Sequence, residues 1–263
     1  MNLFHFRNPD LSLSLFMENM IGVFTGPILR RDGLWIILAR TLLWTGIQTF
    51  FQVLLGMILA LSLNAPIRFA RFFKWMQVLP WAIPGTISLM TLRYEFHPSF
   101  GFINQVLELL PGVATGPAWW SDPFWNFVSM NLVNLWLGVP FMMILLLGAL
   151  QGVDRNCLEA AELDGASRMR RLFSVTLPLI LPTVLPAVLF SAIYSFNNFG
   201  VPYFMNPQEL ENSHLLSLAI FRAASYFNRY SFSSALAIVN TLLVLLMVII
   251  PIRYSGLLQE AKR

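Results

Sequence analysis

Residues 159–167 read EAAELDGAS and are followed by Leu177-Pro178, and this charged stretch lies between two long apolar runs. An apolar run of about 20 residues is long enough to cross a lipid bilayer as a helix. A charged segment between two such runs must therefore lie in water beside the membrane. We interpret residues 159–167 as an aqueous connection of a membrane protein, at which another protein is expected to bind.

The amino-acid composition is that of an integral membrane protein. Of the 263 residues, 57% are hydrophobic and 11% are charged, whereas a soluble domain has about 25% charged residues. So few charged side chains cannot cover a globular surface in water, which excludes a soluble protein. The net charge of +4 comes from Lys and Arg residues that cluster beside apolar runs. Positive charge in that position sets membrane orientation, so we expect no nucleic-acid partner.

Five segments are long and apolar enough to span the bilayer. We expect all five to be helices, because lipid offers no hydrogen-bonding partner to an open backbone. Their predicted bounds are about 35–63, 72–92, 124–150, 177–199 and 232–252. The prolines that predict kinks or local unwinding are Pro80, Pro84, Pro140, Pro182 and Pro186. The predicted fold class is an all-α integral membrane bundle of about five transmembrane helices.

Lysine and arginine residues indicate the orientation of the bundle, since they are enriched in cytoplasmic connections. They cluster at Arg68, Arg71 and Lys74, at Arg155, Arg168, Arg170 and Arg171, and at Arg253, Lys262 and Arg263. The loop 94–123 has no Lys or Arg, and the loop 200–231 has two. We therefore place the connection 151–176 and the C-terminal tail 254–263 in the cytoplasm. The expected location is the bacterial cytoplasmic (inner) membrane, crossed several times.

The N-terminal segment 1–34 fits this topology less simply. Five spans with a cytoplasmic C-terminus place Met1 outside, although the segment carries three arginines and no secretory signal peptide. We expect an extracytoplasmic or interfacial segment, and a chain that starts one or more helices short of a complete ancestral unit. Arg40 lies inside the first span, and we expect its side chain to snorkel to the outer interface. The alternative for Arg40 is an intramembrane ion pair or a substrate contact.

The charged stretch itself predicts two short helices. Residues 158–164 are rich in the strong helix formers Glu, Ala and Leu. Gly165 follows, and glycine is the residue that best ends a helix in a left-handed turn. Ser167 can then cap a second helix over residues 168–173. The result is a helix–turn–helix platform, and the alternative is a simple connector with a solvated charged face.

This stretch resembles the EAA loop of ABC-importer permeases. That signature pairs Glu-Ala-Ala with a glycine a few residues on and a Leu-Pro further downstream, as residues 159–161, 165 and 177–178 do here. The resemblance implies a type I importer permease whose loop docks into a cleft of a cytoplasmic ATPase subunit and passes its motion to the membrane helices. It implies that the coupling residues are Glu159, Ala160, Asp164 and Gly165.

Three further stretches resemble the MalF-type permeases of maltose and maltodextrin importers. They are WSDP at 120–123, NLWLGVPFMM at 134–143 and SAIYSFNNF at 191–199. The likeness extends over most of the chain, from about residue 35 to residue 253, and implies that two helices line a sugar pocket in the middle of the membrane. The pocket residues that it implies are Asn134, Leu137, Gly138, Phe141, Ser191, Ser195 and Asn198.

The chain departs from the MalF-type pattern in several places. Phe141 stands where tyrosine is typical and Ser195 where asparagine is typical, so two hydrogen-bonding groups are lost or shortened relative to a maltose site. Residues 205–209, MNPQE, replace the glycine-rich turn that usually follows the fourth span. The large outer domain of some relatives and their first helices have no counterpart in this sequence.

The implied pocket residues also suit a sugar by their spacing. Asn134 and Phe141 are seven residues apart and share one helix face, and Gly138 between them would let a sugar ring approach the backbone. A second set shares one face at i, i+4 and i+7, namely Ser191, Ser195 and Asn198. Amides and hydroxyls exchange hydrogen bonds with sugar hydroxyls. The alternative is that these polar groups only bridge helices, each contributing roughly 0.6 kcal/mol.

No pattern in the sequence indicates an enzyme. His5, His97 and His214 are scattered without metal-ligand spacing, so we expect no metal site. The sequence contains no Walker-type phosphate-binding loop, so we expect this chain to bind no cofactor and ATP and Mg²⁺ to bind partner ATPase subunits. No Asp or Glu lies inside the five spans, which argues against coupling to protons or sodium through intramembrane carboxylates.

The sequence therefore predicts a permease subunit of an ATP-driven, binding-protein-dependent sugar importer for maltose, maltodextrin or a related oligosaccharide. The resemblance implies a second permease subunit, two cytoplasmic ATPase subunits and an extracytoplasmic sugar-binding protein as partners, besides the sugar and membrane lipid. One alternative is an ABC importer for another small solute such as glycerol phosphate, although the implied pocket holds no Arg or Lys. The other is a secondary carrier or membrane scaffold, which would have no ATPase subunit.

Overall fold

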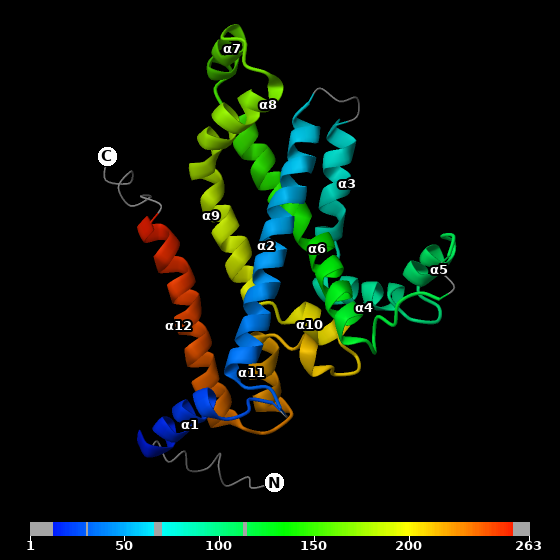
Figure 1. Ribbon diagram of the computed structural model, residues 1–263, viewed down its shortest axis with the longest axis vertical. Coiled ribbons are helices and arrows are strands. Elements are labelled where there is room, and N and C mark those ends of the chain that lie inside the picture. The colour runs from blue at the N-terminus through cyan, green and yellow to red at the C-terminus, as the bar shows by residue number, and fades with distance from the viewer. Residues whose placement is uncertain (1–12, 30, 66–69, 113–114, 255–263) are drawn as a thin grey trace.

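The computed structural model describes residues 13–29, 31–65, 70–112 and 115–254, and this part of the chain is built from helices (Figure 1). The predicted all-α fold class is confirmed. The α-helices are α1 (Leu13–Thr25), α2 (Leu34–Asn64), α3 (Ala70–Ala82), α4 (Gly85–Glu95), α5 (Phe102–Glu108), α6 (Pro123–Gln151), α7 (Arg155–Leu163), α8 (Arg168–Arg171), α9 (Leu177–Phe196), α10 (Gly200–Met205), α11 (Leu216–Ser225) and α12 (Tyr230–Tyr254). A π-helical turn, η2 (Leu172–Thr176), and a 3-10 turn, η3 (Glu211–Ser213), complete them. Of the predicted segments, residues 1–12, 66–69 and 255–263 lie outside the described residues.

Four helical segments within the described residues are long and apolar enough to cross a membrane. They contain α2, α6, α9 and α12, which lie where the spans 35–63, 124–150, 177–199 and 232–252 were predicted. The four helices run lengthwise through the molecule, and the connection between α6 and α9 projects from one end (Figure 1). Short helices gather at the other end, where α1 lies across the start of α12.

The predicted span 72–92 is not one helix. α3 ends at Ala82 and α4 begins at Gly85, and between them Pro84 adopts an extended conformation with φ −53° and ψ 130°. Proline has no N–H for a helical hydrogen bond and disfavours the helical conformation of the residue before it, so the helix breaks there. α3 runs beside the long helices, whereas α4 turns across the bundle towards α10 (Figure 1). The predicted span 72–92 is thus interrupted at Pro84, one of the prolines at which a kink or local unwinding was predicted.

The tightest helix pair is α2 against α6, and glycine permits the close approach. A side chain at Gly56 of α2 would place its Cβ 3.0 Å from Cγ of Met142 and 3.1 Å from the backbone nitrogen of Met143. Ala60 of α2 is fully buried in the same cluster. Small residues allow membrane helices to pack by van der Waals contact, which is the main attraction available where lipid is as apolar as the side chains. α2 and α6 thus form the frame on which α9 packs.

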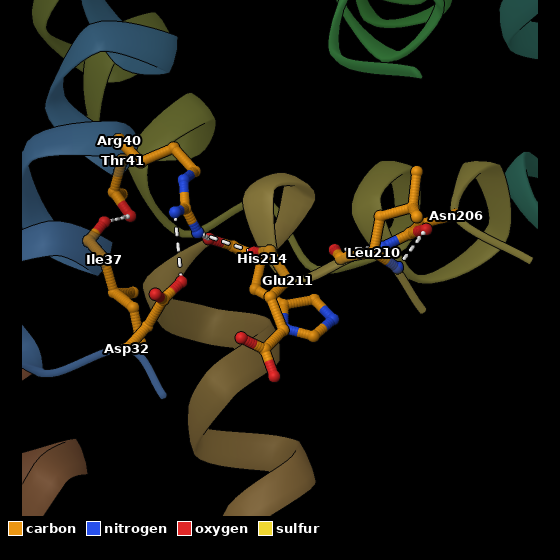
Figure 2. A network of polar contacts seen from close by, with 8 residues as sticks. All are labelled: Asp32, Ile37, Arg40, Thr41, Asn206, Leu210, Glu211 and His214. Atoms are coloured by element: carbon orange, nitrogen blue, oxygen red, sulfur yellow. Dashed lines mark hydrogen bonds and ion pairs between the residues drawn. The ribbon is translucent and has the colours of Figure 1, made fainter. Parts of the chain in front are cut away.

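Arg40 is the centre of a polar network that ties α2 to the loop before α11 (Figure 2). Its Nη2 lies 3.0 Å from Oδ2 of Asp32, and its Nη1 donates to the carbonyl oxygens of Glu211, at 2.6 Å, and His214, at 3.4 Å. The Arg40 side chain is only 14% exposed. Arg40 thus forms an ion pair, which was the alternative considered for it, with Asp32 just before α2. Its two carbonyl partners lie more than 170 residues away, which spacing along one helix does not reveal.

Two side chains hold the same loop from either side. Oγ1 of Thr41 accepts a hydrogen bond from the backbone N–H of Leu216 at 3.0 Å and donates to the carbonyl of Ile37 at 2.7 Å. Asn206 donates to the carbonyl of Leu210 and accepts from its N–H, at 2.8 and 2.9 Å (Figure 2). Backbone groups of an irregular segment inside or beside lipid must find protein partners. The Arg40 network thus allows a non-helical loop to close this end of the bundle.

We predict that Arg40→Ala lowers the free energy of unfolding by about 2 to 3 kcal/mol, because it leaves the carboxylate of Asp32 and two carbonyls without their donor. The measurement is thermal unfolding of the purified protein in lipid nanodiscs. Arg31→Ala is the matched control, since Arg31 is exposed. Equal unfolding temperatures for the two variants would show that the Arg40 network does not stabilise the fold.

Candidate functional site

A cavity of about 770 Å³ lies at the middle of the bundle. It is enclosed by α2, α4, α6, α9 and the start of α10, close to the midpoints of α2 and α6. Of the seven residues predicted to bind sugar, six line it, namely Asn134, Leu137, Gly138, Phe141, Ser191 and Asn198. None of its described lining residues carries a charge. Such a cavity suits an uncharged ligand, because an ionised group would have no counter-ion in the wall.

Ser195, the seventh residue predicted to bind sugar, is not among the residues that line the cavity. Its side chain is fully buried, and its carbonyl oxygen accepts a hydrogen bond from the indole Nε1 of Trp44 at 3.1 Å. The prediction extended one helical face from Ser191 to Asn198. Ser191 and Ser195 both lie within α9, which ends at Phe196. The α9 residues that line the cavity are Phe190, Ser191 and Tyr194, whereas Ser195 lies one position further round the helix and contacts Trp44 of α2.

The polar residues of the cavity wall are joined to each other by hydrogen bonds. Asn198 donates through Nδ2 to Oδ1 of Asn134 at 2.9 Å, and Asn134 donates through Nδ2 to Oε1 of Gln48 at 2.8 Å. Ser191 donates through Oγ to Oε1 of Gln52 at 2.6 Å. These residues come from three different helices and the segment after α9. The same groups thus bridge helices and line the cavity, so the two roles considered for them do not exclude each other.

Gly138 makes room for a protein side chain, whereas it was predicted to make room for a sugar ring. A Cβ at this position would lie 2.4 Å from Nε2 of Gln52. The space above Gly138 is thus filled by the amide of Gln52 and is not open to a sugar ring. Gln52 is a lining residue that the sequence analysis missed. Two glutamines four residues apart, Gln48 and Gln52, inside an apolar span were the available signal, because buried amides in a membrane helix need partners.

An aromatic strip forms another wall of the cavity. The ring of Phe141 lies 5.7 Å from that of Phe190, which stacks on Tyr194 at 6.3 Å. Phe190 and Tyr194 are exposed, Tyr194 by 65%. The sequence analysis singled out neither of these two residues, although their i, i+4 spacing on α9 was visible. Aromatic faces pack against the C–H surface of a sugar ring, while the amides opposite reach its oxygens.

The projecting connection between α6 and α9 forms a two-helix hairpin, α7 and α8 (Figure 1). Asp154 caps the start of α7 by accepting from the N–H of Asn156. At its end, the N–H of Ala166 bonds to the carbonyl of Ala161, and the N–H of Gly165 to that of Glu162. This pattern is a Schellman motif, which requires a left-handed residue. Gly165 supplies that residue with φ +78°.

The second predicted helix, over 168–173, is shorter than expected. α8 ends at Arg171, and the chain continues as the π-helical turn η2 into α9. Ser167 accepts from the N–H of Arg170 and so caps α8 as predicted. Because α8, η2 and α9 follow one another without an intervening loop, the hairpin is continuous with the helix that carries Ser191 and Tyr194.

The hairpin exposes both polar and apolar residues. The four residues predicted to carry coupling, Glu159, Ala160, Asp164 and Gly165, are all exposed on it. Leu163 is 90% exposed, Met169 68% and Phe173 64%. Leu163 lies on α7, beyond the helical segments that are long and apolar enough to cross a membrane, whereas Met169 and Phe173 lie within one of them. The exposure of Leu163 therefore suits a contact with another protein. Within the described residues, no group of three or more metal-ligating side chains occurs.

A helical membrane bundle with a central uncharged cavity and a projecting two-helix hairpin defines the class of transporter permeases. The chain belongs to the family of binding-protein-dependent transport system inner membrane components, whose model matches residues 52–262.

Similarities to named relatives and to a solved structure support the membership of this family. The chain is 29% identical to the galactooligosaccharides transport system permease protein GanP of Bacillus subtilis, over 93% of this chain and 60% of the relative. It is 34% identical to the maltose/maltodextrin transport system permease protein MalF of Escherichia coli K12, over 73% of this chain and 37% of the relative. A bacterial ABC transporter involved in the import of the acidic polysaccharide alginate has the same fold, with TM-score 0.76 at 23% identity over 94% of this chain and 84% of that one. The chain thus spans less than two thirds of the length of these curated relatives.

We predict that Gly138→Ala destabilises the protein by about 1 to 3 kcal/mol, because the new methyl group displaces Gln52 and breaks its bond to Ser191. Gly148→Ala in the same helix is the matched control, since a Cβ there meets nothing within 4 Å. Thermal unfolding in nanodiscs measures both. If the two variants unfolded at the same temperature, Gln52 would not be packed against Gly138.

Proposed function

We propose that this chain is a permease subunit of an ATP-driven, binding-protein-dependent importer for an uncharged oligosaccharide. The observation that carries the proposal is the direct helical path from the exposed hairpin through η2 and α9 to the central cavity. A permease must connect a site for its energy source to a site for its cargo, and this path connects the two. Membership of the family supports the dependence on a binding protein.

The cavity supports a neutral sugar as the cargo. Its wall combines amides, a hydroxyl and an aromatic strip, and its described lining residues include no charge. A phosphorylated solute such as glycerol phosphate would need Arg or Lys in the wall, so the cavity does not favour that alternative. Phe141 offers no hydroxyl where tyrosine is typical of the MalF-type pocket, which favours an oligosaccharide related to maltose over maltose itself. The names of the relatives, for maltodextrin and galactooligosaccharides, lie in this range.

The proposed partners follow from the two ends of the molecule. The exposed hairpin, including Glu159 and Gly165, would dock on one of two cytoplasmic ATPase subunits, which bind ATP and Mg²⁺. A second permease subunit would complete the cavity on its open side. An extracytoplasmic sugar-binding protein would deliver the cargo at the opposite end, where α10 and α11 lie (Figure 1). α12 runs towards the hairpin end, which supports a cytoplasmic C-terminus in the bacterial inner membrane.

The geometry suggests how energy reaches the cargo. Closure of the ATPase subunits on ATP would pull the hairpin, and η2 and α9 would carry the displacement to Ser191 and Tyr194. The cavity would open outward to receive sugar from the binding protein. ATP hydrolysis would release the hairpin and return the cavity to the inside.

We predict that sugar-loaded binding protein stimulates the ATPase activity of the reconstituted complex. Tyr194→Ala should weaken the apparent affinity of the cavity for sugar roughly fivefold, because one aromatic contact is lost. The assay compares binding proteins loaded with maltotriose or with galactobiose. Trp136→Ala is the control, because Trp136 is exposed on α6 outside the cavity. Transport without any ATPase subunit would instead support a secondary carrier.

We also predict that Gly165→Val reduces sugar uptake and sugar-stimulated ATPase activity at normal expression. A β-branched residue in a left-handed conformation is strained by about 1 to 2 kcal/mol, so the end of α7 would rearrange. Gly165→Asn should retain most activity, since asparagine tolerates this conformation. Gly152→Val is a second control with a negative φ of −82° near the same connection. If Gly165→Val kept normal sugar uptake and normal sugar-stimulated ATPase activity, the turn at Gly165 would not be needed for coupling.

A further inference from the structure

A relay of buried amides runs from α10 to α6 through the wall of the cavity. The N–H of Val201 donates to Oδ1 of Asn198 at 3.0 Å, and the chain continues through Asn134 to Oε1 of Gln48. Gln48 then donates through Nε2 to Oδ1 of Asn131 at 2.9 Å and to its backbone carbonyl at 3.2 Å. Gln48 is fully buried and is not among the lining residues of the cavity.

Both ends of the relay are backbone groups, and they fix its direction. A backbone N–H can only donate, so Asn198 must present its oxygen to Val201 and its nitrogen to Asn134. A backbone carbonyl can only accept, so Gln48 must present its nitrogen to Asn131 and its oxygen to Asn134. Rotating any one amide by 180° would set two donors or two acceptors against each other. The orientation of the amides is therefore dictated by the backbone.

The second glutamine of α2 joins the relay from the side. Gln52 donates through Nε2 to Oε1 of Gln48 at 3.3 Å and accepts from the hydroxyl of Ser191 at 2.6 Å. Gly138 leaves the room in which the Gln52 amide lies. Oε1 of Gln48 thus accepts from Gln52 and from Asn134 at once, and it sets the orientation of two lining residues.

The relay determines which groups remain for a ligand. An amide nitrogen carries two N–H groups, and one from each of Gln52, Asn134 and Asn198 is used within the relay. The amide oxygen of each of these three residues accepts one protein donor, which leaves one of its two lone pairs. Each residue therefore keeps one N–H and one acceptor position for a ligand. The hydroxyl oxygen of Ser191 can still accept, since its proton is given to Gln52.

We propose that Gln48 is a positioning residue that fixes the orientation of the Asn134 and Gln52 amides in the cavity wall, so that the cargo meets their N–H groups and oxygens at set positions. The proposal rests on the proposed transport function and adds the specificity of its site. It favours cargo whose hydroxyl groups both accept hydrogen bonds from this wall and donate to it. Gln48 itself lies out of reach of the cargo and acts only through Asn134 and Gln52.

The test is binding of radiolabelled maltotriose to the full complex in nanodiscs, measured without binding protein. Gln48→Leu removes the acceptor for Asn134 and Gln52 and should raise the Kd at least about fivefold, the effect of losing one net hydrogen bond. Assembly of the complex and its maximal ATPase rate should stay unchanged. Gln77→Leu is the matched control, because Gln77 lies on α3 outside the cavity lining.

Coupling between substitutions separates positioning from a general loss of packing. Gln48→Leu combined with Asn134→Ala should raise the Kd little more than either change alone, because both interrupt the same relay. Gln48→Leu combined with Tyr194→Ala should multiply the two effects, because the aromatic strip is independent of the relay. If Gln48→Leu lowers the yield of complex, Asn131→Ala offers a milder interruption with the same expected direction.

The possible results distinguish this proposal from the proposed function. An unchanged Kd in Gln48→Leu and Asn131→Ala, with a raised Kd in Asn134→Ala, would overturn the positioning role and leave the sugar site in place. Multiplicative effects of Gln48→Leu and Asn134→Ala would also overturn it. Unchanged binding in Asn134→Ala and Tyr194→Ala alike would instead remove the cavity from sugar recognition and overturn the proposed cargo site.

Discussion

Lipid offers no hydrogen bonds, and the rest of this structure depends on that constraint. Polar groups inside the bundle are expected to pair with other protein groups, since an unpaired group in hydrocarbon costs several kcal/mol. Two networks show this pairing. At one end of the bundle, Arg40 pairs with Asp32 and donates hydrogen bonds to two carbonyls of the loop before α11. The amides of Gln48, Asn134 and Asn198 pair with each other around the central cavity.

The same constraint explains why stability and recognition share residues here. A ligand cavity in a membrane needs polar groups, and those groups must stay satisfied when the cavity is empty. The relay solves both problems, because the lining amides are paired within the protein and each still keeps one N–H and one oxygen lone pair for a ligand. α9 then links this cavity to the exposed hairpin through a continuous helical path. The cavity and the hairpin thus lie at opposite ends of one continuous helical segment, from α8 through η2 to α9.

Much of the fold could be predicted from patterns along the chain. Long apolar runs predicted α2, α6, α9 and α12. The hairpin was predicted from the Glu-Ala-Ala stretch, the glycine after it and Ser167. A kink or local unwinding was predicted at Pro84, but the pattern could not select between a bend and the start of a second helix, which depends on the packing of α4 against α10. Ser195 was included because it follows Ser191 by four residues on α9, whereas the α9 residues that line the cavity are Phe190, Ser191 and Tyr194.

The sequence by itself determined the class of the molecule: a helical membrane bundle, its aqueous hairpin and the glycine that ends α7. These are local properties, set by hydropathy over one span or by the conformation of one residue. Only the tertiary structure decided which polar residues meet. Gln52 over Gly138, Arg40 beside Glu211, and Asn198 against Asn134 join residues 64 to 171 positions apart. Such pairings are fixed by how helices pack in three dimensions, and no periodicity along one helix contains them.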